Sequence, residues 1–149
     1  MEHHPVFLDR VVGILGPALA EGGVFVDATL GRAGHARALL HAAPRAQLVG
    51  IDRDPDAVES LSVGGRVVAI SYHSLEDRIV KRTLAEEAKG CVCPPDLPVC
   101  ACGAEARIRI LTRRPERPSA QEVERNPRAR AAKLRAAERL GPAVEERSS

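Results

Sequence analysis

The sequence predicts an α/β domain, because short apolar runs alternate with segments rich in helix-forming residues. The first run, 24–26, is followed by a glycine-containing turn and by the helix-forming segment 35–43. A second apolar run, 48–51, then ends at Asp52. Strand, tight turn, helix and strand in this order predict a unit in which two parallel strands are joined by a helix.

The turn after the first strand is the candidate cofactor site. Gly31 and Gly34 leave room for a ligand, and the helix that begins there offers main-chain N–H groups and the positive end of its dipole. Asp52 follows the glycines by about 20 residues, the offset at which a carboxylate meets a ribose hydroxyl in such cofactor domains. The full G-x-G-x-x-G pattern is absent, so a turn that only packs the helix is the alternative.

The remaining elements are expected from apolar periodicity and from proline positions. We expect helical structure over 6–20 interrupted at Pro17, a helix start after 51, a strand over 64–72, a helix from Ser74, a strand over 107–113, and helical structure over 119–140 except around Asn126 and Pro127. Ser74 and Asp77 have the spacing of a capping box. The expected buried side of that helix is Leu75, Ile79, Leu84 and Ala88, and the expected outer side is Glu76, Arg82 and Glu86.

The formal net charge of +2 conceals a basic C-terminal third. Between Arg107 and Arg139, eleven Arg or Lys residues accompany four Glu residues. The candidates for phosphate contact are Arg113, Arg114, Arg117, Arg125, Arg128, Arg130, Lys133, Arg135 and Arg139. Aromatic residues for base stacking are absent from this stretch, so we expect any RNA contact to be electrostatic and salt-sensitive. A solvated helix face followed by a proline-containing tail is the alternative.

Two C-x-C pairs, Cys91 with Cys93 and Cys100 with Cys102, flank a proline-containing loop. Four thiolates can surround one zinc ion tetrahedrally, although C-x-x-C is the more usual spacing. Reduced thiols in a flexible connector are the alternative to zinc. Disulfides are disfavoured because we expect a cytoplasmic protein: no run reaches the roughly 18 apolar residues that span a bilayer, and the start MEHHPV has no signal-peptide features.

Five stretches resemble, in the right order, the bacterial S-adenosylmethionine-dependent methyltransferase family that modifies N4 of a decoding-site cytosine in 16S rRNA. They are HHPVFLDRVV, DATLGRAGHA, IDRDPDAV, GGRVVAISYHSLEDRIVKR and NPRARAAKLRAAERL. The resemblance implies a reduced Rossmann-like (class I) methyltransferase sheet with flanking helices, S-adenosylmethionine as cofactor, and the 16S rRNA of the small ribosomal subunit as partner. It implies cofactor contacts at Ala33, Gly34, His35 and Asp52.

The resemblance also implies one truncated domain over 1–149, with a cofactor-binding half over 1–60. The C-terminal half, 64–149, then carries the Cys-rich loop 91–102 and the basic tail. Between Ser60 and Gly64 the chain lacks what the family has there: two strands, an Asp-Leu-Gly-x-Ser-Ser motif and a helical substrate-recognition insertion. No catalytic residue is therefore implied, and we expect the run 67–70 to pair directly with 24–26 in a three- or four-stranded sheet.

Two classes of function follow. The first is an enzyme that methylates N4 of a cytosine in 16S rRNA, in which His73 or Ser74 approaches the substrate by family position. For His73, a loop histidine bonded to the backbone is the alternative. The second class is a catalytically incomplete remnant or a small basic RNA-binding domain. A nicotinamide-binding Rossmann domain is a third and weaker alternative, because the turn lacks the third glycine.

Overall fold

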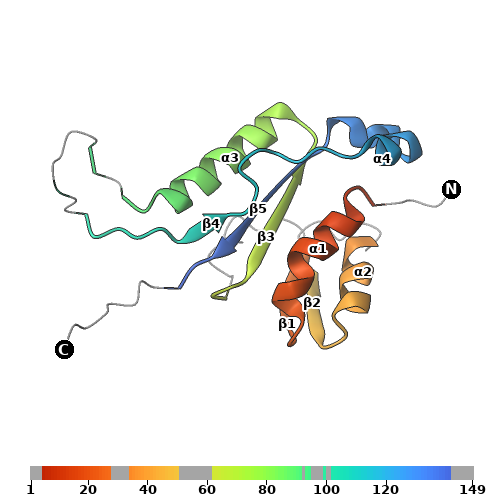
Figure 1. Ribbon diagram of the computed structural model, residues 1–149, viewed down its shortest axis with the longest axis horizontal. Coiled ribbons are helices and arrows are strands. Elements are labelled where there is room, and N and C mark those ends of the chain that lie inside the picture. Colours follow the sequence, from red (N-terminus) through yellow and green to blue (C-terminus); the bar gives the residue numbers. More distant parts are fainter. Residues whose placement is uncertain are drawn as a thin grey trace.

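The computed structural model describes residues 5–27, 34–50, 62–91, 93–94, 99 and 102–141. The elements, in chain order, are α1 (Leu8–Leu19), β1 (Gly23–Asp27), α2 (Gly34–Ala42), β2 (Ala46–Gly50), β3 (Arg66–Ser71), α3 (Ser74–Lys89), β4 (Ile108–Ile110), α4 (Ala120–Arg125), the 3₁₀ helix η1 (Pro127–Ala131) and β5 (Lys133–Arg139). The described strands form two small sheets, β1-β2 and β3-β5-β4, so the molecule is a mixed α/β protein (Figure 1).

The N-terminal part contains the predicted strand, helix and parallel strand. β1 pairs parallel with β2 in the register Gly23↔Ala46, and α2 connects the two strands. α1 buries Val11, Ile14 and Leu19, while α2 buries Ala36 and Leu39. The expected interruption of the first helix is wrong, because Pro17 lies inside α1. Pro17 removes one hydrogen bond from the helix, and the helix continues through it to the buried Leu19.

The C-terminal sheet has β5 at its centre, antiparallel to both neighbours, with Val68 opposite Ala136. α1 and α3 lie on opposite sides of this sheet (Figure 1). Side chains alternate between the two faces: Leu134 and Ala136 belong to the core with α1, while Ala137 packs with Leu84 of α3. The period of two therefore places successive residues of one strand in different cores.

Two expectations about this part of the chain are wrong. The predicted helix over 119–140 is helical only as far as Ala131, and the rest is strand β5. Its alanine, leucine, arginine and glutamate content favours a helix locally, but pairing on both edges and burial of both faces outweigh that preference. The run 67–70 does not pair with 24–26 among the described residues, because β3 takes β5 as its antiparallel partner over six residues.

The third helix also differs from the prediction at its start and in its buried face. Glu76 accepts hydrogen bonds from the main-chain N–H groups of Tyr72 and His73, at 3.2 and 3.3 Å, so the capping residues are not Ser74 and Asp77. Leu75 and Ile79 are 68% and 65% exposed. The prediction is confirmed for Leu84, which is buried, and for Ala88, which packs beside it. Asp77 and Val80 take the places expected for Leu75 and Ile79. None of the described helices has the length and apolar character needed to cross a bilayer.

Candidate functional site

The start of α2 lies at the same edge as the carboxyl ends of the parallel strands β1 and β2. β1 ends at Asp27 and β2 at Gly50. This is the edge at which α/β sheets bind ligands, so the position agrees with the predicted cofactor turn. Gly34 and His35, two of the predicted cofactor residues, are the first two residues of α2. The predicted residues Ala33 and Asp52 lie outside the described residues.

Gly34 and His35 both contact the N-terminal segment that precedes α1. A Cβ atom on Gly34 would lie 2.3 Å from Cγ of Pro5, so this position excludes a side chain. His35 Nε2 lies 2.8 Å from the carbonyl oxygen of Val6. Because a carbonyl oxygen only accepts, Nε2 carries the proton and donates. Gly34 therefore packs against Pro5, and the side chain of His35 binds the main chain of Val6.

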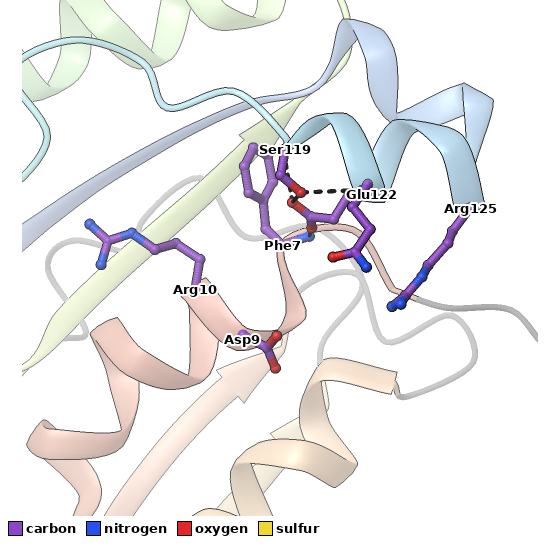
Figure 2. Close-up of a pocket in the computed structure, with 7 residues that line it drawn as sticks. Phe7, Asp9, Arg10, Ser119, Glu122 and Arg125 are labelled. Atoms are coloured by element: carbon purple, nitrogen blue, oxygen red, sulfur yellow. Dashed lines mark hydrogen bonds between the residues drawn. The ribbon is translucent and has the colours of Figure 1, made fainter.

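The same N-terminal segment is held from its other side by Glu122 of α4. The Phe7 N–H donates to Oε1 of Glu122 at 2.8 Å, and the Ser119 N–H donates to Oε2 at 3.0 Å (Figure 2). Burial raises the pKa of the Glu122 carboxyl, but hydrogen bonds from Ser119 and Phe7 outweigh burial, so this pKa is lower than usual. Glu122 was not among the predicted residues, although the S-x-x-E spacing from Ser119 is a capping-box signal.

A pocket of about 340 Å³ opens where α1 meets α4 (Figure 2). It is lined by Phe7, Asp9, Arg10, Ser119, Gln121, Glu122 and Arg125. Arg10 Nε donates to Oε2 of Glu116 at 2.6 Å, and this pairing lowers the pKa of Glu116. Arg10 and Glu122 thus join α1 and the residue before it to α4 and to the segment that precedes α4.

A buried ionic cluster links α3 to β5. Arg135 Nε lies 2.7 Å from Oδ1 of Asp77, and Lys133 Nζ lies 3.3 Å from Oδ2. The hydrogen bonds from Arg135 hold the pKa of Asp77 below its ordinary value. Lys133 and Arg135 were expected among the phosphate contacts. That expectation is wrong for both, because they face α3 and neutralise a buried carboxylate.

The other arginines of the C-terminal third are paired, partly buried or exposed. Arg107 pairs with Glu87, and Arg109 pairs with Glu138. Nη1 of Arg139 is buried and has no hydrogen-bond partner among the described residues. The exposed arginines are Arg113, Arg114, Arg117, Arg125, Arg128 and Arg130, which come from the segment 111–119, α4 and η1. We call these six the arginine surface; they are the residues of the predicted set that solvent reaches most freely.

His73 and Ser74 follow the end of β3, and both are exposed. Among the cysteines, Cys91, Cys93 and Cys102 have sulfur atoms that all lie within 4.8 Å of one another. Cys100 lies outside the described residues. The structure therefore brings together three of the four predicted thiol ligands between α3 and β4.

Comparison with known proteins assigns both halves of the chain to one family. The MraW methylase family matches residues 1–62 and 55–140. These two matches meet where the sequence predicts a missing segment. The chain is 61% identical over 84 residues to ribosomal RNA small subunit methyltransferase H of Thermomicrobium roseum, which covers 56% of this chain and 26% of that protein. The protein of the same name from Heliobacterium modesticaldum is 57% identical over 86 residues, covering 58% of this chain and 28% of the relative.

A third relative of that name, from Halothermothrix orenii, is 55% identical over 83 residues, which is 56% of this chain and 27% of the relative. The matched part of the chain thus spans about a quarter of the length of each of these relatives.

Proposed function

The chain belongs to the MraW methylase family, and from this membership we propose that it serves S-adenosylmethionine-dependent N4-methylation of a cytosine in the decoding region of 16S rRNA. The observation that carries the proposal is that the family matches both halves of the chain, including the turn at the start of α2. In this proposal the chain forms one reduced Rossmann-like (class I) domain. Its cofactor half is residues 1–60, and its C-terminal half is residues 64–149.

The cofactor would lie at the edge formed by the ends of β1 and β2 and the start of α2. Pro5 fills the space beside Gly34 where a side chain would lie, and the imidazole of His35 is bonded to the carbonyl of Val6. The cofactor contacts of both residues would therefore come from their main chain. N–H groups at a helix start suit a carboxylate. Ala33 would extend this contact, and Asp52 would accept hydrogen bonds from the ribose hydroxyls. When bound, S-adenosylmethionine supplies the electrophilic methyl group, and the chain contributes positioning.

The arginine surface would hold the RNA backbone. These six residues are exposed, and none of their guanidinium groups is paired with a side chain among the described residues. Guanidinium groups bind phosphate oxygens with paired N–H donors, which positions an RNA without reading its sequence. The proposed partner is therefore the 16S rRNA within the small subunit, contacted electrostatically.

A second candidate function is RNA binding by a catalytically incomplete member of the family. Two observations favour it. The matched part spans about a quarter of each relative compared above, and the sheet that contains β3 is separate from the β1-β2 sheet. In this case the arginine surface retains its role while methyl transfer is lost.

Cofactor binding is tested by calorimetric titration of the full chain with S-adenosylmethionine. We expect Asp52→Ala to weaken binding by at least about tenfold, which corresponds to about 1.4 kcal/mol, because the ribose loses a charge-assisted acceptor. Asp54→Ala removes a carboxylate from the same segment and is the matched control. Equal affinity for both variants would contradict the ribose assignment. No binding by the unaltered chain would contradict the cofactor proposal itself.

RNA binding and methyl transfer are tested on small ribosomal subunits with methyl-labelled cofactor. The triple variant Arg113→Gln, Arg114→Gln, Arg117→Gln should weaken RNA binding and reduce its dependence on salt, because three phosphate contacts are removed. The triple variant Arg78→Gln, Lys81→Gln, Arg82→Gln on α3 loses the same charge elsewhere and should bind normally. Label in N4-methylcytosine supports the enzyme, whereas salt-sensitive binding without transfer supports the second function.

A further inference from the structure

The cysteine cluster between α3 and β4 has the spacing of a metal site. Tetrahedral zinc with Zn–S bonds of about 2.3 Å places its sulfur ligands about 3.8 Å apart. Cys91 Sγ and Cys102 Sγ are 3.8 Å apart. Cys93 Sγ lies within 4.8 Å of both. A disulfide would instead bring two sulfurs to about 2.05 Å, so the arrangement resembles three corners of a tetrahedron.

We propose that Cys91, Cys93 and Cys102 are three thiolate ligands of one zinc ion, with Cys100 as the fourth. Thiolates are soft ligands that favour zinc over magnesium or calcium. The main-chain N–H of Cys93 points to Cys91 Sγ at 3.4 Å, and such a donor stabilises a thiolate and orients it toward the metal. Cys100 is assigned from the sequence, because Cys100-Ala-Cys102 repeats the C-x-C spacing of the first pair.

The position of the cluster explains what a zinc ion would do there. The chain from 91 to 102 connects the end of α3 to the approach of β4, and Val99 within it is 74% exposed. The side chain of Val99 therefore contributes little apolar burial to this loop. Its base is already narrow: the Arg107 N–H donates to the carbonyl of Glu87 at 2.9 Å. A metal with ligands at both ends of the loop would close it above this base.

The base of the loop is also closely packed at Gly90, the residue after α3. Its φ is +65°, and a Cβ atom there would lie 2.7 Å from the main-chain nitrogen of Ala106. The backbone before the first cysteine and the backbone after the last one thus run against each other. This brings Cys91 and Cys93 close to Cys102 without requiring the methyltransferase function, so the proposed metal site stands independently of the proposed activity.

The metal content of the full chain tests the proposal. The chain is purified under reducing conditions without a chelator, and zinc is measured by mass spectrometry of the elements. We expect about one zinc ion per chain, and replacement by Co²⁺ should give the intense visible absorption of a tetrahedral thiolate site. Cys93→Ser and Cys102→Ser should abolish both signals. Val99→Ser changes an exposed residue of the same loop and should keep both.

Several results would overturn the assignment. Zinc well below one ion per chain, together with no thiolate absorption when the reduced, unaltered chain is titrated with Co²⁺, would exclude the site without relying on any variant that fails to fold. Thiol counting that finds the cysteines oxidised in pairs would assign them to disulfides. Loss of the Co²⁺ signal in Cys100→Ser supports the fourth ligand, and an unchanged signal would overturn it.

Discussion

The two sheets of this molecule differ in how well their own strands are buried and paired. Among the described residues the β1-β2 sheet has two parallel strands, and Val24 of β1 is 58% exposed. The β3-β5-β4 sheet has a central strand whose residues 134, 136 and 137 are fully buried between α1 and α3. Two-stranded sheets are marginal in water, whereas three strands with covered faces are not. The parallel sheet therefore depends on α1 and α2, and the antiparallel sheet is the stable part of the fold.

Ion pairs across its strands also stabilise the antiparallel sheet. Glu138 of β5 accepts from Arg66 of β3 at 2.8 Å and from Arg109 of β4 at 2.7 Å. One carboxylate thus bridges both neighbouring strands, and Arg66 chiefly lowers the pKa of Glu138. Arg66 also donates to the main-chain carbonyl of Ile14 in α1 at 2.8 Å. The C-terminal sheet is thereby fastened to the helix that covers the N-terminal one.

Leu134→Ala should produce the largest loss of stability. Leu134 is fully buried at the centre of the main core, and such a truncation costs about 2–5 kcal/mol through lost burial and the cavity that remains. Urea unfolding measures the loss. Leu75→Ala, at an exposed position, should stay within about 0.5 kcal/mol of the unaltered chain. A small effect of Leu134→Ala would contradict the central place of β5.

Asp77→Ala should cost about 3 kcal/mol, because it leaves Arg135 buried without its carboxylate partner. The expected loss appears in the urea midpoint. Glu86→Ala removes an exposed carboxylate from the same helix and is the matched control. An equal effect of the two substitutions would show that the α3–β5 cluster contributes no more than a surface charge.

Acid should destabilise the chain through the same carboxylate. The pKa of Asp77 is lowered by folding, so its contribution is complete above the ordinary value of 3.8 and is lost as pH falls through the lower folded pKa. The pKa values of Glu116 and Glu138 are lowered in the same sense. The free energy of unfolding should therefore decrease below about pH 4, and Asp77→Asn should decrease less steeply. Parallel pH profiles would contradict the assignment to Asp77.

Glu122→Ala should cost about 1 kcal/mol, because α4 loses its capping interaction and the Phe7 N–H loses its acceptor. Glu124→Ala, an exposed position of the same helix, is the control for helix charge. Thermal unfolding measures both. Hydrogen exchange at Phe7 should accelerate only in Glu122→Ala, and unchanged exchange there would contradict the proposed link between the N-terminal segment and α4.

Local signals predicted the N-terminal elements well and the C-terminal ones less well, for a physical reason. The strand, helix and parallel strand of residues 23–50 are neighbours in sequence, so apolar runs and a glycine-containing turn suffice to indicate them. β5 forms only because β3 and β4 lie beside it, more than 20 residues away along the chain. Its helix-forming composition therefore misled a local prediction.

In the candidate sites, too, features set by neighbouring residues were predicted, and contacts between residues distant in sequence were not. The position of Gly34 and His35 at the start of α2 followed from turn chemistry, as did the clustering of Cys91, Cys93 and Cys102 from their spacing. The contact of His35 with Val6 and the burial of Arg135 against Asp77 depend on residues that are distant in sequence. The number of basic residues over 107–139, together with the family resemblance, predicted an RNA contact for Arg135 instead.

One valine-to-threonine substitution in each sheet should cause the smallest losses of stability and should distinguish the two sheets directly. Val68→Thr places a hydroxyl in a half-buried position packed against the main core and should cost about 1 kcal/mol. Val24→Thr keeps strand propensity at an exposed position and should stay within about 0.5 kcal/mol. Equal losses in urea unfolding would mean that Val24 is covered in solution, and hence that β1 has a neighbour beyond the described residues. Unequal losses would confirm that the parallel sheet keeps an open face.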